Sequence, residues 1–173
     1  MAGAPESPRF DLCTSPLDGI TLIEASAGTG KTHALSGLFL KLVVERSLLV
    51  SEILVVTYTE AATAELRDRI RLMLHSALRF VTEEHPDALE DAAQKEILTR
   101  SRGASGLAER LRDAVRSFDE ADISTIHGFC RSVLAENAFE SGGSFRAELL
   151  SDQRALEQEV TDDFWRARVL AAP

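Results

Sequence analysis

Cysteines and long apolar runs are scarce in this 173-residue sequence, and each scarcity excludes a class of protein. Its 2 cysteines, Cys13 and Cys130, are too few and too far apart for a disulfide framework or a metal knuckle. We therefore expect free thiols in a reducing cytoplasm. No apolar run approaches the roughly 18 residues that a membrane-spanning helix needs. The first residues also lack the basic start and the apolar stretch of a secretory signal.

Positive charge is also in short supply, because the formal net charge is −9 at pH 7. This acidity argues against a protein that wraps nucleic acid through a diffuse electrostatic field. Any contact with nucleic acid must therefore be local. The length is that of one domain, and the hydrophobic content of 45% is sufficient for a real core.

Strand-like and helix-like apolar patterns alternate along the chain. The patterns predict strands at 21–24, 52–57 and 121–126, and helices at 31–46, 60–80, 127–139 and 151–170. Such alternation is typical of an α/β fold in which helices flank a parallel sheet. The continuous apolar run at 52–57 predicts a strand buried on both faces. We expect Phe164 and Trp165 to anchor the last helix.

The segment 82–120 is polar and charged, and it separates the second predicted strand and its helix from the third strand. Two helical stretches, at about 86–99 and 106–118, are broken by the sequence SRGASG. The pattern predicts a helical insertion on the surface of the domain.

A glycine-rich stretch, EASAGTGKT at 24–32, lies between the first strand-like run and the first helix. Backbone N–H groups at such a turn, together with the helix dipole, form a phosphate cradle. Lys31 then supplies a cation for the β- and γ-phosphates, and Thr32 a hydroxyl for Mg²⁺. Ala25 stands where the usual pattern has glycine, which costs little if its φ is negative. A chance GTGKT turn is the alternative, and the flanking strand and helix disfavour it. The predicted cradle comprises Ala25, Ser26, Ala27, Gly28, Thr29, Gly30, Lys31 and Thr32.

Two further motifs narrow the class of P-loop protein. The stretches VVTYTEAATAELRDRI at 55–70 and STIHGFCRSVL at 124–134 resemble motifs Ia and Ib of the UvrD-like superfamily-1 DNA helicases. They follow the glycine-rich loop in that family's order. In finer detail LIEASAGTGKT, TYTEAATAELRDRI, TIHGFC and NAFESG resemble the RecB-type helicase–nucleases of this family. The resemblance covers nearly the whole chain.

The resemblance implies a RecA-like P-loop NTPase domain, with 1–173 as the N-terminal part of the first motor domain. It implies ATP and Mg²⁺ as cofactors, single-stranded DNA as substrate, and RecC- and RecD-like subunits as partners. The activity implied is that of an ATP-dependent DNA helicase with exodeoxyribonuclease activity, acting in double-strand-break repair and recombination. Lys31 and Thr32 would be its catalytic residues in this part of the chain.

The resemblance also implies two sets of DNA contacts at the ends of predicted strands. These are Thr57, Tyr58 and Thr59 after the second strand, and Thr125, His127 and Gly128 after the third. Hydroxyls and backbone N–H groups suit phosphates, and an aromatic ring supports a base. Structural roles remain open: the threonines could merely end strands, Tyr58 could lie in the core, and His127 could cap its helix. Glu65 and Arg67 are interpreted as a solvated helical face with some structural pairing.

Departures from the family pattern shape two further expectations. Upstream of the loop, the family often has a glutamine that recognises adenine. The matching stretch SPLDGIT has Asp18 and no glutamine. No strand ending in the Walker B acidic pair and no nuclease motif occurs, so we expect an N-terminal piece without ATPase of its own. The alternatives are another P-loop class, such as a nucleotide kinase or a signalling GTPase, and a non-catalytic partner-binding module. A kinase or GTPase would need an acceptor or base-recognition motif, and none is visible.

Overall fold

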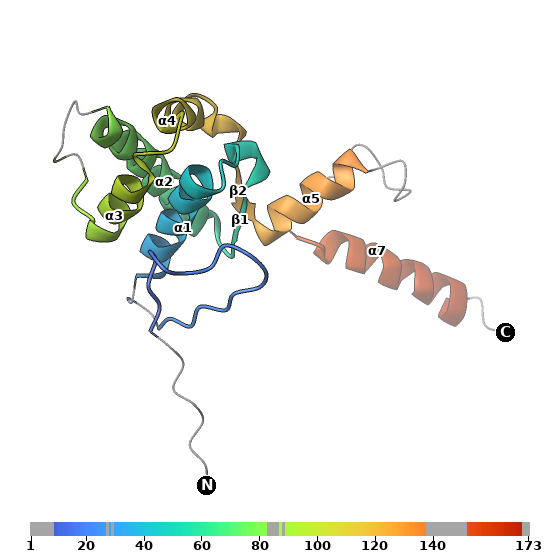
Figure 1. Cartoon of the computed structure of the whole chain (residues 1–173). Coiled ribbons are helices and arrows are strands. Elements are labelled where there is room, and N and C mark those ends of the chain that lie inside the picture. The colour runs from blue at the N-terminus through green and yellow to red at the C-terminus, as the bar shows by residue number, and fades with distance from the viewer. Residues whose placement is uncertain are drawn as a thin grey trace, which may run out of the picture. The chain divides into compact units, whose positions relative to one another are not determined.

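A computed structural model of the chain describes residues 9–26, 28, 30–82, 87, 89–137 and 152–170 (Figure 1). It divides into two compact units, Met1–Phe129 and Cys130–Pro173, and each unit is described by itself. The first unit contains α1 (Lys31–Glu45), η1 (Val50–Glu52), β1 (Leu54–Thr57), α2 (Glu60–Val81), α3 (Ala92–Ser101), α4 (Leu107–Arg116), η2 (Phe118–Glu120) and β2 (Asp122–Thr125). Helix α5 (Ile126–Glu136) begins in the first unit and continues into the second.

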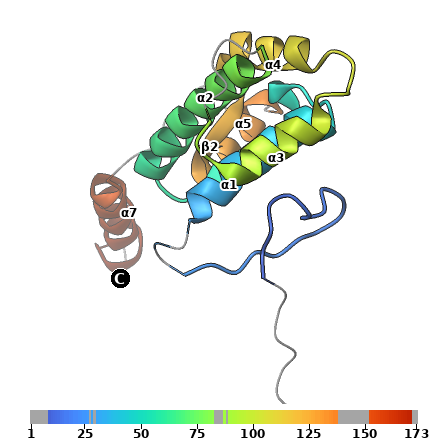
Figure 2. The same ribbon diagram turned by 60° about the vertical axis from the view of Figure 1, so that its left-hand side comes forward.

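Four helices, α1 to α4, pack against one another and form most of the core of the first unit (Figures 1 and 2). The helices α1 and α2 begin where the sequence predicts, and each ends within one residue of its predicted end. The apolar residues at helical spacing in 60–80 predict one buried face for α2, made of Ala62, Leu66, Ile70, Met73, Ala77 and Phe80. Four of them, Leu66, Ile70, Met73 and Ala77, are buried, whereas Phe80 is partly buried and Ala62 is exposed. The hydrophobic periodicity therefore gives both helices and most of their buried stripe.

The described sheet has two strands, β1 and β2, and they are parallel as predicted. Their register pairs Leu54 with Asp122 and Thr57 with Thr125, so both strands end at the same level. Helix α2 packs against both strands. The prediction that β1 is buried on both faces is wrong, because Leu54 and Val56 are 46% and 44% exposed. The face on which these two side chains lie is therefore partly open to solvent.

The strand predicted at 21–24 is not formed, and Leu22 there is exposed. Instead, the chain here runs from the end of α1 back to its start. Asp18 pairs with Arg46, the residue that ends α1, and the chain must then return to Lys31 at the start of α1. A helix of 15 residues is about 22 Å long, so the intervening segment is stretched alongside it. It reaches neither strand of the sheet in the pairing given above.

The helices α3 and α4 confirm the helical character of 82–120 but not its expected place on the surface. Helix α3 begins at Ala92, later than predicted, where Asp91 caps it by accepting a 2.7 Å hydrogen bond from the Gln94 N–H. Ile97, Leu98 and Leu111 are fully buried in the core shared with α1 and α2. The polar composition reflects the outer faces of these helices, which conceal the narrow apolar stripe from a simple count.

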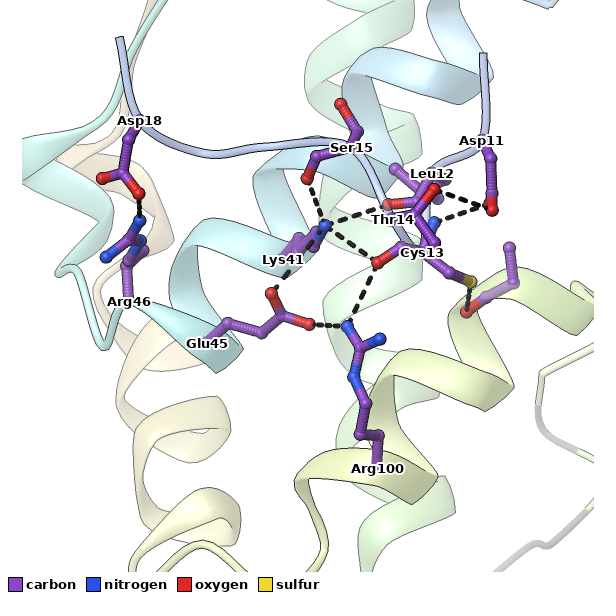
Figure 3. Close-up of polar contacts among 11 residues, drawn as sticks. Asp11, Leu12, Cys13, Thr14, Ser15, Asp18, Lys41, Glu45, Arg46 and Arg100 are labelled. Atoms are coloured by element: carbon purple, nitrogen blue, oxygen red, sulfur yellow. Dashed lines mark hydrogen bonds and ion pairs between the residues drawn. The ribbon is translucent and has the colours of Figure 1, made fainter. Parts of the chain in front are cut away.

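The N-terminal segment 11–15 is fixed on α1 and α3 by a buried lysine (Figure 3). The Lys41 ammonium donates to the carbonyls of Leu12, Cys13 and Ser15 at 3.2, 3.1 and 2.5 Å. Arg100 of α3 donates to the same Cys13 carbonyl at 3.2 Å and pairs with Glu45. The three carbonyls thus accept the three protons of the buried Lys41 ammonium.

Close packing and a turn reinforce this attachment. The Leu12 side chain lies so near Gly37 of α1 that an added Cβ would stand 2.3 Å from one of its methyl carbons. Asp11 accepts from the Cys13 N–H and the Thr14 hydroxyl, both at 2.9 Å, and these bonds lower the pKa of its carboxyl. Burial raises the pKa of the Cys13 thiol, which lies in the core, whereas Cys130 is exposed.

The second unit holds the rest of α5, then α7 (Arg154–Trp165) continuing into the π-helical turn η3 (Arg166–Leu170). Helix α7 begins three residues after Ser151, the predicted start, and no residue of it is buried. Phe164 and Trp165 are 63% and 56% exposed, so they do not anchor this helix as expected. Within the described residues, no helix is long and apolar enough to cross a membrane.

Candidate functional site

The glycine-rich loop has the backbone geometry that a phosphate cradle requires at two of its positions. Gly28 and Gly30 have φ values of 77° and 89°, in the left-handed region where glycine is favoured. Helix α1 follows Gly30 directly and has no side-chain cap and no acidic residue in its first turn. Its first N–H groups and its dipole therefore offer a positive end to an anion. Ala27 and Thr29, the other predicted members between Ser26 and Lys31, lie outside the described residues.

Lys31 bends back over this loop, and its ammonium donates to the carbonyl of Ala25. The bond joins the first predicted position of the cradle to the first residue of α1. Lys31 is exposed, and Thr32 beside it is partly buried. The lysine thus closes the loop with a bond to a neutral carbonyl, a partner that a phosphate oxygen would readily replace.

The next residue of α1 ties the loop to α3. His33 Nε2 lies 3.0 Å from Asp91 Oδ2, and Asp91 is the residue that caps α3. The first turn of α1 is in this way held by a helix of the 82–120 segment. His33 had no role in the sequence analysis, because its partner is distant in the sequence.

The end of β1 forms a small network of threonine hydroxyls. The Oγ1 atoms of Thr57 and Thr63 are hydrogen-bonded at 2.6 Å, so that one hydroxyl donates to the other, and the second donates to the Thr59 carbonyl oxygen, which lies 3.1 Å from both. Thr59 is the N-cap of α2 and accepts from the Ala62 N–H at 3.2 Å. These hydroxyls therefore fix the turn from β1 into α2.

The end of β2 is organised in the same way by Thr125. Its Oγ1 accepts a 3.1 Å hydrogen bond from the Gly128 N–H, which caps the first turn of α5. The same hydroxyl donates to Glu60 Oε1 on α2 at 3.2 Å. At Gly128 a Cβ would stand 3.1 Å from this oxygen, so a larger residue would crowd the cap. Thr125, not His127, is the cap of this helix.

Two of the predicted DNA contacts are exposed and make no hydrogen bond with any described residue. Tyr58 is 82% exposed, which rules out the alternative that it belongs to the core. His127 is also exposed. Because the strands end in register, these two side chains follow the same edge of the sheet.

The charged residues of α2 divide into an anchor and a surface pair. Arg67 is partly buried and donates to the Ile123 carbonyl of β2 at 2.8 Å, so it makes a structural pairing and is less solvated than expected. Glu65 pairs with Arg69 at 3.1 Å on the exposed face, as expected of surface residues. Hydrogen bonds thus attach α2 to both strands near the ends at which Thr57 and Thr125 lie.

The structure does not connect the glycine-rich loop and the predicted DNA contacts through one shared sheet. That arrangement needed a strand at 21–24, and no such strand forms. Asp18, the residue in place of an upstream glutamine, is engaged by Arg46. The sequence analysis also missed Glu60 and Thr63. Thr63 follows Thr59 by one helical turn, which is a signal for the hydroxyl network, whereas nothing local points Glu60 toward Thr125.

Comparisons with known proteins agree with the motifs. Residues 10–169 match the family model described as the UvrD/REP helicase N-terminal domain. The chain is 42% identical over 167 residues to the RecBCD enzyme subunit RecB of Escherichia coli strain K12, covering 91% of this chain and 14% of that protein. RecB of Haemophilus influenzae is 40% identical over 164 residues, with 88% and 14% covered. RecB of Mycobacterium tuberculosis strain H37Rv is 37% identical over 163 residues, with 92% and 15% covered.

These matches confirm the resemblance to the RecB-type members that the motifs indicate. The chain spans about one seventh of the length of these relatives.

Proposed function

Because this chain belongs to the UvrD/REP helicase family, we propose that it supplies the ATP- and single-stranded-DNA-binding part of an ATP-dependent DNA helicase. One observation carries this proposal. Two helices, α2 and α5, each begin with a threonine cap directly after parallel strands that end in register. The edge so formed presents Tyr58 and His127 on a rigid support.

The loop before α1 fits the triphosphate of ATP. Left-handed Gly28 and Gly30 lead into an uncapped helix N-terminus, and among the described residues the hydrogen-bond partner of Lys31 is the Ala25 carbonyl. Lys31 would exchange the Ala25 carbonyl for the β- and γ-phosphates, and the Thr32 hydroxyl would reach Mg²⁺. Bound Mg²⁺ neutralises charge on the phosphates during transfer. The remaining members of the cradle, Ser26, Ala27 and Thr29, keep the role that the motif assigns to them.

The edge after β1 and β2 fits a single strand of DNA. The Tyr58 ring is free to stack on a base, and His127 and the backbone around Gly128 lie where a phosphate would pass. Thr57, Thr59 and Thr125 hold these groups in place through the hydrogen bonds described above. A rigid support suits a motor that must transmit small movements to a strand.

For the whole protein we propose a RecB-type helicase–nuclease that works with RecC- and RecD-like subunits in double-strand-break repair and recombination. The resemblance to RecB supports this assignment. The free thiols of Cys13 and Cys130 fit a reducing cytoplasm.

Binding of Mg-ATP to the 173-residue chain, measured by calorimetry, tests the nucleotide half of the proposal. Lys31→Ala should weaken binding by about 10- to 100-fold, the effect of losing a charged hydrogen bond. Arg116→Ala is the charge control, because Arg116 is an exposed residue in the last turn of α4 and is not part of the loop. Equal affinity of wild type and Lys31→Ala would remove the assignment of the loop.

Fluorescence anisotropy with a labelled oligodeoxythymidine tests the DNA half on the same preparations. Lys31→Ala should bind this strand as wild type does in the absence of nucleotide. A chain that binds neither ATP nor DNA would favour the partner-binding alternative.

A further inference from the structure

Glu60 links the turn after β1 to the turn after β2 through one side-chain hydrogen bond. It lies in the first turn of α2, directly after the β1 turn, and its Oε1 accepts the 3.2 Å hydrogen bond from the Thr125 hydroxyl. That hydroxyl in turn receives the Gly128 N–H at 3.1 Å. One carboxylate therefore connects the start of α2, the end of β2 and the first turn of α5.

This geometry commits the Thr125 hydroxyl to the protein. A hydroxyl has one proton to donate, and Thr125 gives it to Glu60. Thr125 is only 7% exposed, so little of it could meet a phosphate. Its use must be to set the direction in which the α5 turn, with His127, leaves the sheet.

We propose that Glu60 is a positioning residue for single-stranded DNA, which it serves by fixing the Thr125–Gly128 turn relative to Tyr58. This inference rests on the proposed function of the edge. Glu60 acts in two opposing ways. Its hydrogen bond orders the turn, whereas its negative charge repels the phosphates of a bound strand.

Two substitutions separate these effects. Glu60→Gln keeps an oxygen that accepts from Thr125 and removes the charge, so it should bind the strand as tightly as wild type or tighter. Glu60→Ala removes both, and affinity should fall by about two- to tenfold, the range expected for one net hydrogen bond. If only charge mattered, both variants would bind more tightly.

Thr125→Val tests the other end of the same bond. It removes the hydroxyl with little change in shape, and it should weaken binding at least as much as Glu60→Ala does, because the Gly128 N–H also loses its acceptor. The double variant Glu60→Ala/Thr125→Val should then be no weaker than Thr125→Val alone, because the bond to Glu60 is already lost in that variant. Glu65→Ala is the charge control, since Glu65 lies on the same helix and pairs only with Arg69 among the described residues.

The experiment measures two quantities on the 173-residue chain: anisotropy of a labelled oligodeoxythymidine, and hydrogen exchange of the Gly128 amide by NMR. Glu60→Ala should speed exchange at Gly128 and weaken binding, and Glu60→Gln should restore both. Equal behaviour of Glu60→Ala and Glu60→Gln, or unchanged exchange at Gly128, overturns the role of Glu60 while wild-type binding stands. Absence of binding by wild type overturns the proposed function itself, and the role of Glu60 with it.

Discussion

Tyr58 places an aromatic ring in solvent at the end of a strand, where packing gives no reason for it. Its neighbours Thr57 and Thr59 hold the turn by hydrogen bonds, so the backbone under the ring is fixed although the ring itself is free. A fixed backbone lowers the entropy cost of placing the ring against a base. Such a residue matters to binding much more than to stability.

Tyr58→Ala should therefore weaken single-strand binding by about 1–3 kcal/mol, the usual value for one stacked base. Thermal stability and Mg-ATP binding should stay the same, because the side chain is exposed. Anisotropy, thermal melting and calorimetry on one preparation check these three outcomes. Tyr58→Phe is the control, since it keeps the ring and should bind like wild type. A lower melting temperature with unchanged DNA affinity would show that the ring serves packing.

At the scale of elements, the N-terminal segment and α3 are joined to α1 by charge as well as by apolar contact. Lys41 is almost fully buried, and it meets three carbonyls and, at 3.9 Å, Glu45. The segment that leads to the predicted phosphate loop is thus anchored to α1 by Lys41. Loss of the Lys41 hydrogen bonds would release this segment without unfolding α1.

Lys41→Met should destabilise the attachment by about 2–4 kcal/mol, because it removes the Lys41 donor from the carbonyls of Leu12 and Ser15, whereas the Cys13 carbonyl keeps Arg100. Reaction of Cys13 with a thiol reagent measures this locally. Burial raises the pKa of this thiol above its unfolded value, so its contribution to stability is present below the unfolded pKa and is lost as the pH rises through the folded value.

At neutral pH Cys13 should react slowly in wild type, exposed Cys130 should react fast, and Lys41→Met should speed Cys13 alone. Lys95→Met makes the same chemical change on α3 and should leave both rates as they are. Equal rates for Cys13 in wild type and Lys41→Met would contradict the anchoring role.

The elements also show what the sequence reveals and what it conceals. Periodicity predicts α1 and α2 well because each buries a long apolar stripe, and alternation with apolar runs predicts parallel β1 and β2. The segment at 21–24 looks like a strand because it is apolar, but strand formation depends on a neighbouring strand, and this segment pairs with neither β1 nor β2. The links from Glu60 to Thr125 and from Lys41 to the N-terminal segment join distant positions, and no local pattern encodes them.

At the scale of the whole molecule, an acidic chain is proposed to bind a polyanion. With a net charge of −9, attraction cannot come from the chain as a whole. The residues proposed to contact DNA include no lysine or arginine, and nearby Arg67 is committed to the Ile123 carbonyl. Few cations would then leave the DNA on binding.

The affinity of the 173-residue chain for a single strand should therefore depend weakly on salt. A logarithmic plot of the binding constant against salt concentration should have a slope no steeper than about −1.5, the value for roughly two neutralised phosphates. Anisotropy titrations at several salt concentrations provide this slope. A slope of about −4 or steeper would place the strand on a basic surface other than this edge.

The pairing of β1 with β2 also sets the order in which the molecule can assemble. The helices α2, α3 and α4 all lie between the two strands in sequence, so the strands meet only after that length of chain has been closed into a loop. Contacts of such long range form late, whereas the packing of successive helices can begin early. A nascent chain would thus form the helical cluster before it forms the sheet edge that carries Tyr58 and Thr125. The ability to bind single-stranded DNA would therefore develop after the helices have packed. An incompletely folded copy of the chain would be unable to compete for DNA.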